Sequence, residues 1–87
     1  MPRDSQGMAK AQHAPKYRAL VDLLRQLREE ANQTQRDLGK RLRKPQSWVH
    51  NCESANRRVD VTEFAAWCKA CGADPRKAFA RVLEICR

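Results

Sequence analysis

The 87-residue chain has few glycines, few aromatic residues and no long apolar run, and each shortage excludes a class of protein. Its three glycines are too scattered to form a phosphate-cradling loop, and no stretch approaches the roughly 20 apolar residues of a membrane span. The first residues, MPRDSQGMAKAQHAPK, lack the apolar segment of a secretory signal. The sequence therefore predicts a cytoplasmic protein that makes no contact with a membrane.

Patterns of catalytic side chains are missing as well. No pair of carboxylates falls on an apolar face, and no serine, histidine and aspartate are spaced as a catalytic set. His50 and Cys52 stand two apart in an expected helix, so their side chains point in different directions. We therefore expect neither enzyme activity nor a cofactor.

The four cysteines match no common metal-site spacing. Cys68 and Cys71 form one C-x-x-C, whereas a structural zinc site needs four ligands, and Cys52, Cys86 and both histidines are widely spaced. Two interpretations remain, which are zinc or redox chemistry and buried free thiols. Because the C-x-x-C lies inside an expected helix at core spacing, the sequence favours buried thiols and no metal.

Basic residues are what the chain has in surplus. It carries 18 lysines and arginines against 10 aspartates and glutamates, which gives a formal net charge of +8. This charge favours an anionic partner, most often nucleic acid, but does not distinguish DNA from RNA or an acidic protein. Residues 1–15 have no apolar period and are expected to form a flexible tail, which leaves 16–87 as one small domain.

The apolar residues of this domain recur at helical spacing. They predict helices over 16–31, 34–42, 46–54, 60–71 and 75–86. Capping signals support three of these starts, with Thr34 before Asp37, Asp60 before Glu63, and Asp74 before Pro75. The expected inward residues are Tyr17, Leu20, Leu24, Leu27, Ala31, Leu38, Leu42, Val49, Cys52, Phe64, Trp67, Cys68, Cys71, Phe79 and Val82. We see no strand signal, so the sequence predicts an all-α protein, a compact five-helix bundle.

Residues 34–58 carry the clearest functional pattern. Two short helices flank a break at residues 43–45, and the second helix has an amide-rich outer face, which is the layout of a DNA-binding helix-turn-helix. An amide side chain can meet adenine through two hydrogen bonds, and the basic residues nearby can contact phosphates. Trp48 either packs on the flank of this helix or lies against a sugar-phosphate strand, and packing is favoured.

Three segments resemble the lambda-repressor-like (Cro/XRE-type) helix-turn-helix regulators. They are LRQLREEANQTQRDLGKRL, PQSWVHNCESANRRVDVTEF and ACGADP, within about residues 18–84. The resemblance implies that Gln35 clamps a DNA phosphate and that Arg28 pairs with Glu53. Together with the residue types, it predicts base contacts from Gln46, Ser47, His50 and Asn51. Backbone contacts are predicted from Gln35, Arg43, Lys44, Trp48, Asn56 and Arg57.

The chain departs from the family pattern at several positions. Arg43 and Ala55 stand where the family usually has glycine, and a left-handed backbone at Arg43 costs roughly 1 kcal/mol. We therefore expect a differently shaped turn. Gly39 replaces a common alanine and allows close helix approach. His50 and Asn51 replace the usual Ser-Lys, so no relative indicates the target sequence.

The resemblance implies a sequence-specific transcriptional regulator of the nucleoid, a repressor that binds an inverted repeat of double-stranded DNA as a homodimer. Leu83, Ile85 and Cys86 extend beyond the stripe that the last helix can bury on its neighbour, so they are the expected dimer surface. A monomer whose last helix packs wholly on its own core is the alternative. A protein-interaction module on the same scaffold, such as an antitoxin or anti-activator, is the alternative function.

Overall fold

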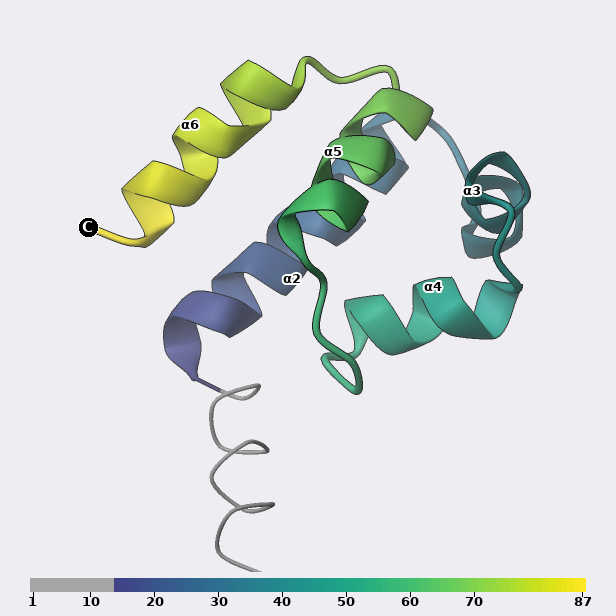
Figure 1. Ribbon diagram of the computed structural model, residues 1–87, viewed down its shortest axis with the longest axis horizontal. Helices are drawn as coiled ribbons and strands as arrows, with labels where there is room; N and C mark the ends of the chain where they lie inside the picture. Colours follow the sequence, from purple (N-terminus) through teal and green to yellow (C-terminus); the bar gives the residue numbers. More distant parts are fainter. Residues whose placement is uncertain (1–13) are drawn as a thin grey trace, which may run out of the picture.

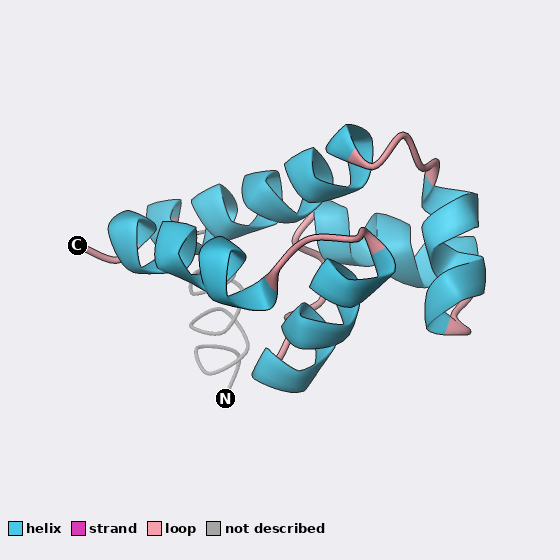
Figure 2. Ribbon diagram, turned by 90° about the horizontal axis from the view of Figure 1, so that it is seen from above, coloured by secondary structure: helices cyan, strands magenta, loops and turns pink. Residues whose placement is uncertain are grey.

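Five α-helices make up most of residues 14–87, which are the residues that the computed structural model describes. They are α2 (Pro15–Glu30), α3 (Gln35–Leu42), α4 (Gln46–Glu53), α5 (Val61–Ala70) and α6 (Pro75–Ile85). Every regular element in this range is a helix (Figure 2), and the expected all-α, five-helix architecture is confirmed. α3 and α4 lie at one end of the molecule and α6 lies at the other (Figure 1).

The predicted flexible tail, residues 1–15, lies outside the described residues except for its last two. Ala14 precedes α2, and Pro15 is the first residue of that helix. Proline suits this position because the first helical N–H has no partner within the helix.

Local capping explains where three helices begin. The Thr34 hydroxyl accepts the Asp37 N–H, and the Asp37 carboxylate accepts the Thr34 N–H, both at 3.0 Å. Asp60 and Glu63 make the same reciprocal pair at the start of α5. The Glu63 backbone N–H lowers the pKa of Asp60, because a hydrogen bond to the carboxylate stabilises its charged form. At the start of α6, the carboxylate of Asp74 accepts the Arg76 N–H, and Pro75 is the first residue of the helix.

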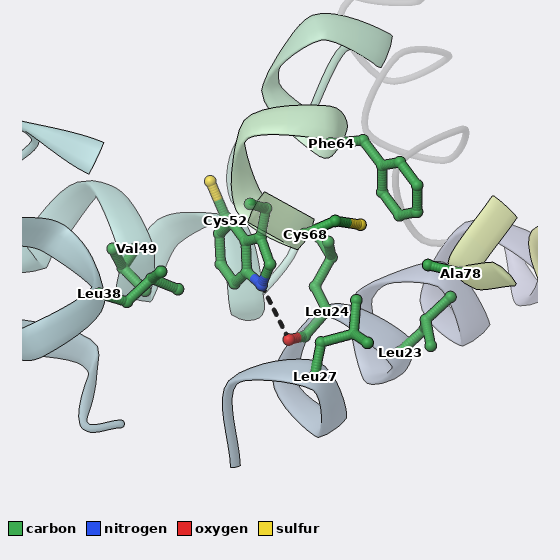
Figure 3. Close-up of a cluster of buried hydrophobic side chains, with 10 residues drawn as sticks. Leu23, Leu24, Leu27, Leu38, Val49, Cys52, Phe64, Cys68 and Ala78 are labelled. Carbon is green, nitrogen blue, oxygen red and sulfur yellow. Dashed lines mark hydrogen bonds between the residues drawn. The ribbon is translucent and has the colours of Figure 1, made fainter. Parts of the chain in front are cut away.

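The core lies where α2 and α5 pack together, and α3, α4 and α6 close its sides (Figure 3). Trp67 is fully buried, and its indole N–H donates to the Leu24 carbonyl at 3.0 Å, which ties α5 to α2. Leu23, which lies partly off the expected stripe, is also buried, as is Val21. α2 is therefore buried over a wider arc than one stripe, because α4 and α6 pack against it in addition to Trp67 of α5.

The expectation for the face of the last helix is wrong in part. Ala78 is the buried residue of α6, whereas Phe79 is 45% exposed and touches Phe64 edge to face. Val82 and Ile85 are partly buried against the core, so Ile85 is removed from the predicted dimer surface. The reason is that α6 packs against α2 as well as α5, which turns residues 78, 82 and 85 inward.

The turn between α3 and α4 is left-handed despite its arginine, so the expectation of a differently shaped turn is wrong. Arg43 has φ 58° and ψ 42°, and Ala55 after α4 has φ 62°. The Lys44 N–H donates to the Gly39 carbonyl at 2.8 Å, so the turn satisfies the end of α3. Hydrogen bonding and packing therefore offset the backbone strain at Arg43.

Gly39→Ala is expected to destabilise the protein, although alanine is the better helix former by roughly 1 kcal/mol. A Cβ atom at Gly39 would lie 2.7 Å from the Lys44 carbonyl oxygen, so α4 would have to shift away from α3. We expect a loss of about 1–3 kcal/mol in the free energy of unfolding, measured by urea denaturation. Lys40→Ala, at an exposed site of the same helix, is the control. A Gly39→Ala protein as stable as wild type would contradict the close approach.

Candidate nucleic-acid interface

The outer face of α4 is polar and open. Gln46, Ser47 and His50 are exposed and Asn51 is half-buried, while Val49 and Cys52 are fully buried on the opposite face. The first turn of α4 has no side-chain cap, which leaves backbone N–H groups and the positive end of the helix dipole at this surface. The helix therefore presents hydrogen-bonding side chains outward from a fixed apolar base.

A buried carboxylate joins the three helices around this surface. The Glu53 side chain is 1% exposed and accepts two Arg28 N–H groups, from Nε at 2.6 Å and from Nη2 at 3.0 Å. Arg28 also donates to the Gln33 carbonyl at 2.8 Å. The hydrogen bond to Glu53 raises the pKa of Arg28 further above neutrality. Arg28 and Glu53, which the family resemblance pairs, are thus in contact, and they connect α2 to the end of α4.

Gln35 belongs to the same network, which sequence reasoning missed. Its Nε2 donates to Glu53 Oε1 at 3.1 Å, and its second amide hydrogen remains free for another acceptor. The side chain borders a shallow groove shared with Thr34, Arg36 and Gln46, at the start of both α3 and α4. No sequence spacing marks the link between Gln35 and Glu53, because it depends on the angle between α3 and α4.

Trp48 is half-buried on one flank of α4. Its ring lies 6.3 Å from that of Trp67, centroid to centroid, and the Lys44 Nζ and Arg57 Cζ atoms lie 5.3 and 4.9 Å from its centroid. These contacts correspond to the packing alternative for Trp48, with cations attracted to the ring face. A Trp48 contact with a DNA strand stays a prediction.

The predicted DNA-backbone-contact residues differ in how many contacts they already make within the protein. Arg57 already donates to both Glu63 oxygens, at 3.2 and 3.3 Å, and to Cys52 Sγ at 3.8 Å. Asn56 is exposed, and its side-chain amide donates to the side-chain oxygen Oδ1 of Asn51 at 3.5 Å. Arg43 is exposed and borders a shallow groove between α3 and α5 together with Arg41 and Lys69. Lys44 remains beside Trp48, at the start of α4.

A tyrosine fixes the loop that follows α4. The Tyr17 hydroxyl accepts the Val59 N–H at 3.0 Å and donates to the Arg57 carbonyl at 3.3 Å. The Arg58 guanidinium lies 4.8 Å from the Tyr17 ring centroid. The first turn of α2 thereby holds the backbone that carries Asn56 and Arg57.

The cysteines are protected to different degrees. Cys52 and Cys68 are buried and Cys71 is half-buried, while Cys86 is exposed. Burial raises the thiol pKa of Cys52 and Cys68, and it raises the pKa of Cys71 to about 11. These three thiols are mostly protonated at neutral pH, which disfavours nucleophilic attack and metal binding. Residues 14–87 contain no cluster of three or more metal-ligating side chains.

This chain is similar to a known family and to solved structures. A family described as a helix-turn-helix domain matches residues 19–83. A solved structure, titled XRE-family like protein from Pseudomonas syringae pv. tomato str. DC3000, is 40% identical, with a TM-score of 0.78. The match covers 90% of this chain and 95% of that one. The comparison with curated proteins gave no match. Among residues 14–87, every helix is too short or too polar to cross a membrane.

Proposed function

Because this chain belongs to the Cro/XRE-type helix-turn-helix family, a fold of DNA-binding regulators, we propose that it is a sequence-specific repressor acting as a homodimer on an inverted-repeat operator. α4 is the proposed recognition helix. The observation that carries the proposal is its exposed polar face, held in place from behind by Val49, Cys52 and the buried Glu53. The nucleoid is where such a protein would act.

The proposed contacts fall into two groups. Gln46, Ser47, His50 and Asn51 contact base edges, since amide, hydroxyl and imidazole groups can discriminate donors from acceptors in the major groove. Gln35, Arg43, Lys44, Asn56 and Arg57 contact the sugar-phosphate backbone, with Trp48 supporting Lys44 and Arg57. The free amide hydrogen of Gln35 suits a phosphate oxygen near the start of α3.

Gln46→Ala and Asn51→Ala are expected to weaken binding to the cognate site by roughly 1–3 kcal/mol each, with little effect on random duplex DNA. Both side chains are needed for reading bases and neither supplies charge. Lys44→Ala is the matched comparison, and it should weaken cognate and random binding about equally. Arg57 is unsuitable for this purpose because it also binds Glu63. Equal losses on both DNAs for the two amide variants would show that α4 does not read the sequence.

The proposed dimer surface is the apolar patch formed by Val61, Phe79 and Leu83, which are 75%, 45% and 56% exposed. Val61 and Phe79 border a cleft of about 150 Å³ between α5 and α6. Cys86 is exposed near the end of α6 and remains at the edge of the proposed interface. An exposed apolar patch of this kind commonly marks a protein interface.

Leu83→Glu is expected to prevent dimerisation, because it places a charge within the apolar patch. Sedimentation equilibrium at micromolar concentration measures the mass of both proteins. We expect a dimer for wild type and a monomer for the variant, with Glu84→Gln as the control. A monomeric wild type that keeps its operator affinity after Leu83→Glu would contradict the proposed dimer.

A further inference from the structure

A cleft of about 250 Å³ lies between α2 and α4, beside the outer face of the recognition helix. Its wall includes Arg18, Asp22 and Arg25 from α2, Gln35 from α3, and His50 and Ser54 from α4. His50 and Trp48 are two residues apart, or about 200° around the helix. The cleft therefore lies on the flank of α4 opposite the stack of Lys44, Trp48 and Arg57.

The arginines of this cleft have unused hydrogen-bonding capacity. Glu53 Oε1 already accepts Arg28 and Gln35, and Arg25 approaches it only to 3.7 Å with a side chain that is 56% exposed. Within residues 14–87, the exposed Arg18 guanidinium has no ion-pair partner. The second amide hydrogen of Gln35 is free at the same place. Arg18 is therefore unpaired at the cleft, and Arg25 and Gln35 keep further donor hydrogens beyond their contacts with Glu53.

The charge of the cleft is positive but reduced by one aspartate. Two arginines and two carboxylates border it, and one of those carboxylates, Glu53, is neutralised by Arg28. Arg18 and Arg25 then oppose Asp22 alone. Asp22 stands four residues after Arg18 and three before Arg25, so it lies on the same face of α2 as both. An anion that enters the cleft would be attracted by the arginines and repelled by Asp22.

We infer that this cleft binds a backbone phosphate of the DNA strand that borders the α2 side of the major groove. The inference rests on the proposed function. A helix in the major groove has a sugar-phosphate strand on each side, and Lys44 and Arg57 already face one flank. Arg18, Arg25 and Gln35 supply the equivalent contacts on the other flank. α2 is thus part of the DNA-binding surface, in addition to supporting the core.

Variants that change the charge of the cleft test this inference, because removing an arginine and removing the aspartate should change DNA affinity in opposite directions. Arg25→Gln and Arg18→Gln should each weaken binding to cognate and random duplexes about three- to tenfold and flatten the log–log salt slope by about 0.9. Asp22→Asn should strengthen binding to both duplexes, because it removes the repulsion. Fluorescence anisotropy across a salt series measures all three effects. Arg76→Gln, at an exposed site of α6, is the control and should leave affinity unchanged.

Thermal melting establishes that each variant remains folded, and Arg18→Gln has no contact with Glu53 to complicate the comparison. If the DNA affinities and salt slopes of Arg25→Gln and Arg18→Gln equal those of Arg76→Gln while wild type binds DNA, the cleft inference is overturned and the proposed function stands. If wild type binds no duplex at all, the proposed function fails with it. Calorimetric titration with inorganic phosphate distinguishes a site for free phosphate from a site for a DNA phosphate. Tight binding of free phosphate, with no change in DNA affinity in the cleft variants, would also overturn the inference.

Discussion

Glu53→Ala is expected to lower the free energy of unfolding by about 3–5 kcal/mol, which is a large part of the stability of a protein of 87 residues. The carboxylate is 1% exposed and is the common acceptor for Arg28 and Gln35. Its removal leaves the Arg28 guanidinium, itself only 12% exposed, without its counter-charge. The connection between α2, α3 and α4 is lost at the same time.

Urea denaturation followed by circular dichroism measures this loss, and Glu84→Ala is its matched control. Glu84 also forms an ion pair, with Arg87 at 2.9 Å, but both side chains are at least 70% exposed, so the pair should contribute little. The double variant Arg28→Met with Glu53→Leu should recover much of the stability, because an apolar pair needs no charge compensation. Equal midpoints for Glu53→Ala and Glu84→Ala would mean that the buried pair does not hold the helices together.

The affinity for duplex DNA is expected to fall about 10³- to 10⁵-fold between 50 and 200 mM salt if a dimer binds. Five cations are proposed to contact the DNA strands in each protomer of the proposed dimer, namely Arg18, Arg25, Arg43, Lys44 and Arg57. Each phosphate contact contributes about −0.9 to the slope of log affinity against log salt, because binding releases condensed counterions. The dependence should therefore be steep for cognate and random DNA alike.

Fluorescence anisotropy with a labelled duplex measures this slope. Lys77→Gln, in the exposed face of α6, changes the net charge equally but should leave the slope unchanged, since α6 lies at the far end from α4 (Figure 1). A slope near zero for wild type would exclude the phosphate contacts. A slope that changes as much for Lys77→Gln as for Lys44→Gln would mean that net charge, rather than these positions, sets the affinity.

The sequence predicted those features that depend on neighbouring residues. Thr34 with Asp37 and Asp60 with Glu63 are spaced for reciprocal capping, and both pairs form. The inward residues of α4 could be predicted in the same way, because Val49 and Cys52 recur at helical spacing in a short amphipathic segment, and both are buried. Local hydrogen bonds and periodicity leave few alternatives at these positions.

Features that depend on the arrangement of several helices were not predictable in the same way. The orientation of α6 follows from its packing on two helices, so Ala78 is buried and Phe79 is partly exposed. The left-handed Arg43 follows from the close approach of α3 and α4 at Gly39. The cleft that contains Arg25 needs three helices to form it. Sequence spacing shows that Arg18 and Arg25 share a face of α2 but does not show what that face borders.

Selection of binding sites from random duplex DNA tests the central proposal most directly, which is that the outer face of α4 reads a DNA sequence. We expect enrichment of a short inverted repeat with half-sites about one DNA turn, roughly 34 Å, apart, bound at least about 10³-fold more tightly than scrambled DNA. The double variant Gln46→Ala with Asn51→Ala should lose that preference while it still binds DNA at low salt. No enriched sequence for wild type, or an unchanged preference in the double variant, would contradict the role of α4 in reading the DNA sequence.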